Sequence, residues 1–145
     1  MERATLRFYL DRVEPYIGQP MLCSLLGAWA ARLGDRDRAL ELLQRGYADY
    51  INEPFRETDE FSRTRHPERP RVGPMTAHLG GFLTTLMVGL PGLRIGPEDA
   101  CRWPQRPVVL PAGWRSIEVE RLWLRGRPAR LRAEHGAERS ELAFT

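Results

Sequence analysis

The sequence predicts an α+β fold, with a helical segment over residues 1–92 and a small antiparallel β-rich domain over residues 93–145. Two patterns carry this prediction. Apolar residues recur with helical spacing in the first segment, whereas in the second they alternate with polar residues, as in strands with one buried face. With 145 residues, 42% of them hydrophobic, the chain can bury a core of ordinary size.

Four helices are expected in the helical segment, over residues 4–13, 19–34, 36–51 and 75–89. Pro15 stops the first helix. The second is expected to carry Pro20 in its first turn and to end at Gly34, and Asp35 is in position to cap the third. The short connection between the second and third helices predicts an antiparallel helix hairpin.

The last expected helix carries two adjacent glycines, Gly80 and Gly81, within an almost entirely apolar stretch. Glycine weakens an isolated helix by about 1 kcal/mol relative to alanine. The pair therefore predicts that another backbone, or a ligand, approaches the helix closely. His78 lies on the same helix, where a partly buried helix histidine is the simplest interpretation.

Short strands are expected over residues 106–111, 114–126, 127–136 and 138–145. The apolar alternation changes phase between Val119 and Leu122, which predicts a β-bulge at Arg121. Gly126 stands where a hairpin would turn. We expect an antiparallel unit of three or four strands, which must pack on the helices or on partner strands because it is too small for a closed sandwich.

Residues 52–62, NEPFRETDEFS, form an acidic loop with four carboxylates and two phenylalanines: Glu53, Glu57, Asp59, Glu60, Phe55 and Phe61. A run of acids in a loop is usually a solvated surface. The flanking rings favour a second interpretation, in which part of the loop turns inward to bury them. A carboxylate beside aromatic side chains loses hydration, which raises its pKa toward the range of a general base. The spacing does not identify the inward acid.

Composition gives no support to several functional classes. The 22 basic residues are all arginine and are spread along a chain of net charge +3, so no nucleic acid partner is expected. The two cysteines and three histidines lack the spacing of metal ligands, and no metal or cofactor is expected. Residues 80–92, the longest apolar stretch, are fewer than the ~20 of a membrane span. The N-terminus is charged and unlike a signal peptide, so a soluble, cytoplasmic protein is expected.

The strings EPFRETDEFS and GPMTAHLGGFLTTLMVGLPGLRI, which a strand-rich tail follows, resemble the C-terminal portion of glycoside hydrolase family 65. That family includes acid trehalases, glucosylgalactosyl-hydroxylysine glucosidase, and the phosphorylases of maltose, trehalose and kojibiose. GQPMLCSLLGAWAARLGDRDRALELL is similar to the family's last helix hairpin, so the resemblance covers nearly the whole chain.

The resemblance implies that the helical segment is the C-terminal part of an (α/α)6 barrel catalytic domain. The family's hydrolases invert the anomeric centre with a general acid and a general base that stand ~6.5–9.5 Å apart. Aligned on the Glu53-Pro54-Phe55 turn, the base falls on Glu60, with Asp59 as the alternative. The implied substrate is an α-linked glucosyl disaccharide of the trehalose or kojibiose type. Its expected contacts are Phe55, Phe61, His78, Gly80 and Gly81.

Two alternatives stay open. Phosphorylases of the family use phosphate in place of the base and carry a histidine two residues after the glycine that opens the last helix. The segment here is Gly73-Pro74-Met75, without the histidine, which favours water as the nucleophile, although His78 could replace it. A non-catalytic helical binding module is the other alternative.

The general acid of the family belongs to an earlier barrel helix, and a closed barrel needs twelve helices. We therefore expect a truncated or split piece of such an enzyme, which lacks the acid and is inactive alone. The apolar faces of residues 22–33 and 82–87 are expected to be covered by the missing barrel polypeptide or by self-association.

Overall fold

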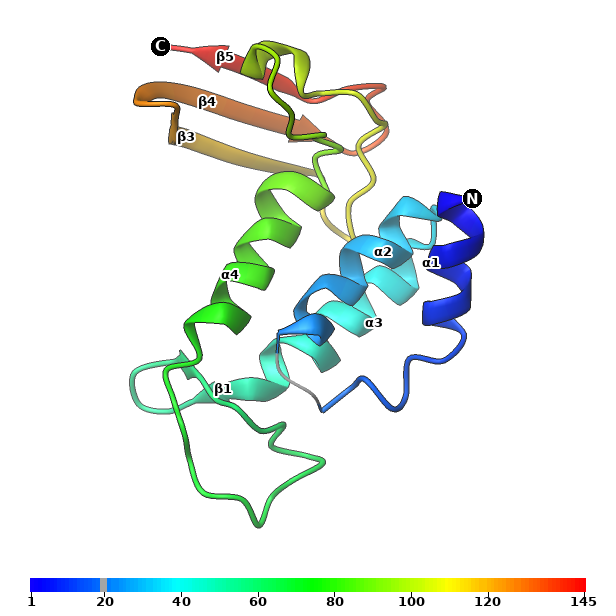
Figure 1. The fold of residues 1–145 in the computed structure, drawn as a ribbon, viewed down its shortest axis with the longest axis vertical. Coiled ribbons are helices and arrows are strands. Elements are labelled where there is room, and N and C mark those ends of the chain that lie inside the picture. Colours follow the sequence, from blue (N-terminus) through cyan, green and yellow to red (C-terminus); the bar gives the residue numbers. More distant parts are fainter. Residues whose placement is uncertain (19–20) are drawn as a thin grey trace.

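A computed structural model of the chain describes residues 1–18 and 21–145. It contains both helices and antiparallel strands, which confirms the mixed α+β class. The helices occupy the middle of the molecule (Figure 1). A loop region with a very short hairpin lies at one end of them, and a three-stranded sheet lies at the other.

The α-helices are α1 (Glu2–Leu10), α2 (Leu26–Arg32), α3 (Arg36–Gly46) and α4 (Thr76–Thr84). Short 3-10 turns are η1 (Leu22–Leu25), η2 (Ala48–Tyr50) and η4 (Ala100–Arg102), and a π-helical turn, η3 (Thr85–Gly89), continues α4. A helix is therefore present in each expected region, and the first three end earlier than the apolar pattern predicts. The second also begins late, at Leu26, because Met21 has a φ of 69° and Leu22–Leu25 form a 3-10 turn. The prediction for Pro20 lies outside the described residues.

The boundary between α2 and α3 follows the prediction. Gly34 has a φ of 88°, the left-handed conformation in which glycine ends helices. The Asp35 carboxylate accepts a hydrogen bond of 3.0 Å from the Arg38 backbone N–H, so it caps α3. The two helices lie side by side as the expected hairpin (Figure 1).

The two glycines of α4 have different surroundings. A Cβ atom added to Gly81 would lie 2.1 Å from Ser24 Oγ and 3.2 Å from the Met21 carbonyl oxygen, so the η1 backbone approaches the helix at this point. Ser24 is fully buried and donates to Met21, which leaves it little room to move. A Cβ atom at Gly80 would meet nothing within 4 Å. The expected close approach is confirmed for Gly81 and is wrong for Gly80.

This difference gives a matched pair of substitutions. Gly80→Ala should raise the free energy of unfolding by about 0.5–1 kcal/mol, because alanine favours helix and the site is open. Gly81→Ala should lower it by about 1–3 kcal/mol through steric overlap with η1. Urea unfolding of the two variants measures both values, and equal effects at the two positions would contradict the packing described.

The sheet is antiparallel, with strand order β3 (Ser116–Leu124), β4 (Arg127–Glu134) and β5 (Glu141–Phe144). Its register shifts between Val119 and Leu122, which confirms the bulge expected at Arg121. Arg125 and Gly126, with φ values of 50° and 77°, form the two-residue turn between β3 and β4. The inward side chains of β4 are fully buried: Ala129, Leu131 and Ala133.

Residues 106–111 form no strand, so that prediction is wrong. The segment is a strap whose Val108 and Leu110 side chains are fully buried. Pro107 and Pro111 lack the N–H groups that a strand ladder needs. The Arg36 guanidinium instead binds carbonyl oxygens at the end of the strap, among them that of Leu110 at 2.8 Å.

One core joins the regions on either side of residue 92. It packs side chains of α1, α2 and α3 against the strap and against Ala133 of β4. A second cluster lies under the sheet, where Leu131 and Leu142 pack with Trp103 and with Val88 of η3. Among the described residues, no helix combines the length and the apolar character that a membrane span requires.

Candidate active site

The acidic loop is built on a minimal hairpin, β1 (Ile51–Asn52) paired with β2 (Glu57–Thr58). The segment after β2 also lies against residues 72–75, since Met75 N–H donates to the Thr58 carbonyl oxygen at 2.8 Å and the Thr58 hydroxyl donates to the Met75 carbonyl oxygen at 3.0 Å. The loop is thereby attached to the start of α4.

The four carboxylates differ in exposure. Glu53 is exposed at the hairpin tip, Glu57 and Glu60 are half-buried, and Asp59 has no exposed surface. The acid that turns inward is therefore Asp59, which the sequence identified only as the alternative to Glu60.

Both oxygens of Asp59 are engaged. Oδ1 accepts hydrogen bonds from the backbone N–H groups of Glu60 at 2.7 Å and Val72 at 2.9 Å. Oδ2 accepts from the Arg63 guanidinium at 3.0 Å. A carboxylate with this set of donors joins three segments of the loop and has little capacity left to activate a water molecule.

The pKa of Asp59 is lowered, not raised. Burial on its own raises the pKa, but the hydrogen bonds from Val72 and Glu60 stabilise the ionised form and outweigh it. The expected rise in pKa for the inward acid is wrong, because the loop surrounds this carboxylate with donors and not with aromatic rings. Asp59 has a structural role.

Glu60 is held by its backbone and left open at its side chain. Its N–H donates to Asp59 Oδ1 and also to the Val72 carbonyl oxygen at 2.9 Å. Within residues 1–18 and 21–145, its half-buried carboxylate has no hydrogen bond or ion pair. A fixed backbone with an unoccupied carboxylate is the arrangement that a general base requires.

The two phenylalanines do not bury together as expected. Phe55 is 85% exposed at the hairpin tip, so the prediction that its ring turns inward is wrong. Phe61 is half-buried; its ring makes an edge contact with His66 at 6.0 Å and lies 5.3 Å from the Arg69 guanidinium. Phe61 directly follows Glu60, so it is the better placed of the two to meet a ligand there.

Further polar side chains bind the residues around Asp59. Arg63 and Arg71 both donate to Asn52 Oδ1, at 2.7 and 2.5 Å, and Arg63 links that amide to Asp59. Asn52 is buried, and its Nδ2 has no partner among the described residues. No local sequence pattern predicts this group, because Asn52 and Arg71 are nineteen positions apart.

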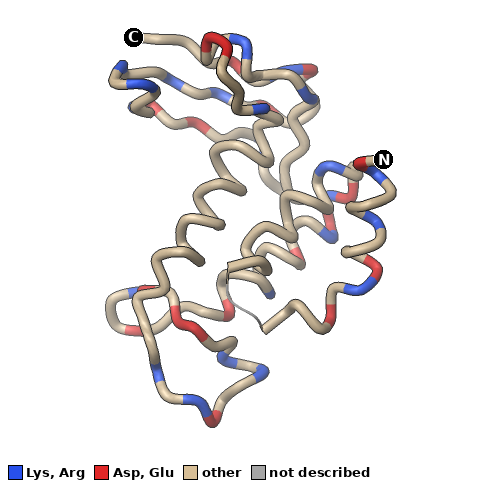
Figure 2. The backbone as a smooth tube through the Cα atoms, viewed as in Figure 1, with Lys and Arg blue, Asp and Glu red and all other residues tan. Residues whose placement is uncertain are grey.

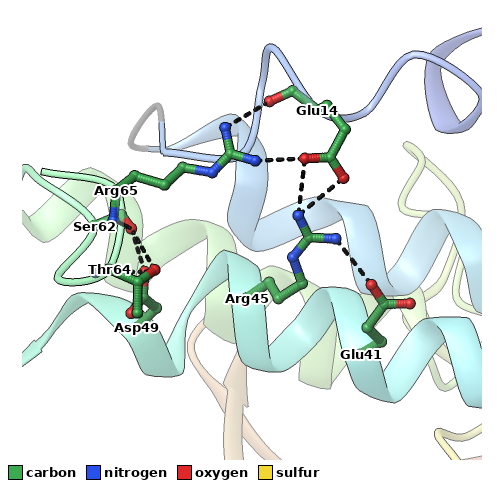
Figure 3. Close-up of polar contacts among 7 residues, drawn as sticks. All are labelled: Glu14, Glu41, Arg45, Asp49, Ser62, Thr64 and Arg65. Carbon is green, nitrogen blue, oxygen red and sulfur yellow. Dashed lines mark hydrogen bonds and ion pairs between the residues drawn. The ribbon is translucent and has the colours of Figure 1, made fainter.

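The next part of the loop is tethered through Asp49 (Figure 3). Its carboxylate accepts from the Ser62 hydroxyl and from the Thr64 hydroxyl at 2.9 Å. Arg65 then binds Glu14, which also pairs with Arg45 of α3 at 2.9 Å. A hydrogen bond from Arg45 is the main cause of the lowered pKa of Glu14.

A cavity of about 340 Å³ lies beside this network. Its lining includes Gln44, Arg45, Asp49, Thr64 and Arg65, which are groups that can bind hydroxyls. Glu60 is not part of this lining, so the cavity and the candidate base are separate features.

His78 is fully buried, which contradicts the substrate contact expected for it. Its Nδ1 accepts a hydrogen bond of 3.0 Å from the Met21 N–H, and its ring lies 4.5 Å from that of Tyr50 and 5.6 Å from that of Tyr47. Burial lowers its pKa. His78 is therefore a core residue, as the simpler interpretation of the sequence had it.

The expected contacts on α4 are also limited. Gly81 faces η1 and so cannot meet a ligand, whereas Gly80 faces open space. In the described parts of the chain, no three His, Cys, Asp or Glu side chains are grouped as metal ligands.

No model of a known protein family matches the sequence, and no curated protein matches it.

The role of Asp59 can be tested by Asp59→Asn, which should lower the free energy of unfolding by about 1–3 kcal/mol because it weakens the ion pair and two acceptor contacts. The folded-state pKa of Asp59 is depressed, so its contribution is present above about pH 4 and is lost as pH falls through the folded value. The variant should therefore lose less stability than the wild type between pH 5 and pH 2, as followed by urea unfolding.

The exposed Glu53→Gln variant serves as the control, with an expected change within about 0.5 kcal/mol. A neutral effect of Asp59→Asn at pH 7, or an unchanged acid dependence, would contradict the structural role.

Proposed function

We propose that residues 1–145 are the C-terminal portion of an inverting α-glycoside hydrolase similar to glycoside hydrolase family 65. The substrate is an α-linked glucosyl disaccharide of the trehalose or kojibiose type, and Glu60 is the general base. The general acid is supplied by polypeptide outside these residues, which completes an (α/α)6 barrel around the helices.

One observation carries this proposal: Asp59 Oδ1 accepts hydrogen bonds from the backbone N–H groups of both Glu60 and Val72 and so fixes the Glu60 backbone, while the Glu60 carboxylate has no hydrogen bond or ion pair in the described chain. In an inverting mechanism the base takes a proton from the water that attacks the anomeric carbon, while the acid protonates the leaving oxygen on the opposite face. Such a base needs a free carboxylate held in one place.

The neighbours of Glu60 suit a sugar. Phe61, the next residue along the chain, has a partly exposed ring, and an aromatic face can pack on the apolar C–H side of a glucose ring. Phe55, at the hairpin tip, is exposed and open to a ligand.

The apolar surface of α4 supports a missing partner. Leu79 and Leu83, one helical turn apart, are 40% and 41% exposed, and Met21 beside the start of η1 is 49% exposed. Phe82, Leu86 and Met87, which were expected to be uncovered, are only half-exposed. Phe82 stacks on Tyr47 with ring centroids 3.7 Å apart. Further barrel helices, or a second copy of the chain, would cover Leu79 and Leu83.

The phosphorylase alternative is weaker on this geometry. Phosphorylases of the family carry a phosphate-binding histidine at the position that Met75 occupies here, so His78 would have to replace it. His78 is fully buried, and its Nδ1 accepts a hydrogen bond from the Met21 backbone N–H. A non-catalytic binding module would hydrolyse neither disaccharide, so an activity measurement distinguishes that alternative from the hydrolase.

The proposal predicts hydrolysis of trehalose or kojibiose when the chain is mixed with a barrel polypeptide encoded beside it. NMR of the fresh products should show that the attacked glucosyl unit is released as β-glucose. Glu60→Gln should lower kcat at least about a hundredfold, because a general base contributes a factor of that order or more. Glu57→Gln, the same change on a half-buried neighbour, should retain activity.

Three results would contradict the proposal: no hydrolysis in any mixture, equal activity in Glu60→Gln and wild type, or release of a sugar 1-phosphate that requires phosphate.

Docking and chemistry can be separated by a second pair of variants. Leu83→Glu places a charge on the apolar surface of α4 and should weaken binding of the barrel polypeptide at least about tenfold, because the charge must be desolvated. Glu60→Gln should bind that polypeptide as wild type does. Calorimetric titration measures both, and unchanged binding of Leu83→Glu would remove α4 from the interface.

A further inference from the structure

A cavity of about 230 Å³ lies where α1, α2, the end of η3 and the strap meet. Its floor is apolar, with Leu6, Leu90 and Val109 among the lining residues. Ligand pockets of drug-sized molecules are on the order of 300–1,000 Å³. The cavity is therefore suited to a smaller ligand and is too small for a nucleotide.

Its polar lining is three arginines and one glutamate: Arg3, Arg32, Arg106 and Glu2. Charged residues of both signs accordingly gather near the start of α1 (Figure 2). The lining therefore carries a net formal charge of +2. One dianion would balance it, whereas a monocarboxylate would leave one positive charge uncompensated.

Two of the arginines already converge on one carboxylate. Arg32 Nη1 lies 3.0 Å from Glu2 Oε1, and Arg106 Nη2 lies 3.3 Å from both oxygens of Glu2. The Arg32 and Arg106 side chains are 29% and 30% exposed, respectively. The pKa of Arg32 is lowered, first by burial and next by the positive charge of Arg106. The carboxylate of Glu2 raises it, but offsets these two effects only in part.

We propose that Arg32 and Arg106 form a binding site for a small phosphate dianion, either inorganic phosphate or a short phosphomonoester, and that Glu2 occupies the site as an internal competitor. Paired guanidinium groups are the usual protein ligands of phosphate oxygens, because their N–H groups match two oxygens at once. The ligand would link α2 to the strap and would displace the Glu2 carboxylate, through which α1 is now paired with both arginines.

This site is distinct from the candidate base. The cavity reaches Gly89, at the end of the helix that α4 and η3 form together, whereas the acidic loop contacts Met75, next to its first residue. At 1.5 Å per residue, that helix separates the two by about 20 Å. Phosphate bound at Arg106 is therefore too far from Glu60 to attack a sugar there.

Isothermal titration of the full chain with inorganic phosphate tests the proposal, at constant ionic strength set with sodium chloride. Saturable binding is expected, together with a rise in Tm that grows with phosphate concentration. Arg106→Gln should weaken binding at least about tenfold, because a charge-assisted contact is lost. Glu2→Gln should strengthen it about two- to fivefold, which is the range of one exposed ion pair removed as a competitor.

Arg139→Gln is the matched control, since Arg139 is exposed and makes no ion pair in the described chain; it should bind as wild type. Titration with glycerol 3-phosphate distinguishes the two ligand sources: tighter binding than phosphate indicates that the apolar floor holds an organic body, and equal binding indicates inorganic phosphate. Absence of saturable binding, or equal binding in Arg106→Gln and Arg139→Gln, would overturn the proposal. So would weaker binding in Glu2→Gln.

Discussion

The carboxylate of Asp59 is the interaction on which the arrangement of the acidic loop depends. It lies in the interior with both oxygens bonded, and it joins the end of β2 to Arg63 and to the segment before α4. A buried charge is tolerated only where donors replace its lost hydration. The loop must therefore fold around Asp59, and the position of Glu60 follows from that constraint.

The helix formed by α4 and η3 connects the acidic loop to the rest of the molecule. Its start is bonded to the acidic loop through Thr58, its middle packs on η1 at Gly81, and Val88 near its end lies in the core under the sheet. The loop, the helix hairpin and the sheet are thus placed by one element. The shared core between the strap, the helices and Ala133 holds the two ends together.

The features that the sequence predicted correctly are local ones. A cap at Asp35, a stop at Gly34, a bulge at Arg121 and a turn at Gly126 each depend on residues within a few positions. The failure at residues 106–111 is also local in origin, since apolar content suggested a strand while Pro107 and Pro111 removed its donors.

The environment of the loop acids could not be predicted, because it is made by contacts distant in sequence. Asp59 is inward because Val72, thirteen positions away, supplies a donor, and His78 is enclosed because Met21, fifty-seven positions away, bonds to it. Neither spacing nor composition contains these pairings. They give Asp59 and His78 structural partners, whereas the Glu60 carboxylate, like that of Glu57, has no hydrogen bond or ion pair among the described residues.

The most direct test of this account is a pH titration of the Asp59 carboxyl carbon by NMR in the folded chain. Donors that favour the ionised form should give a pKa clearly below the ordinary aspartate value. A pKa at or above that value would mean that Asp59 is not the ionised centre of the loop, and the placement of Glu60 as a presented base would lose its physical support.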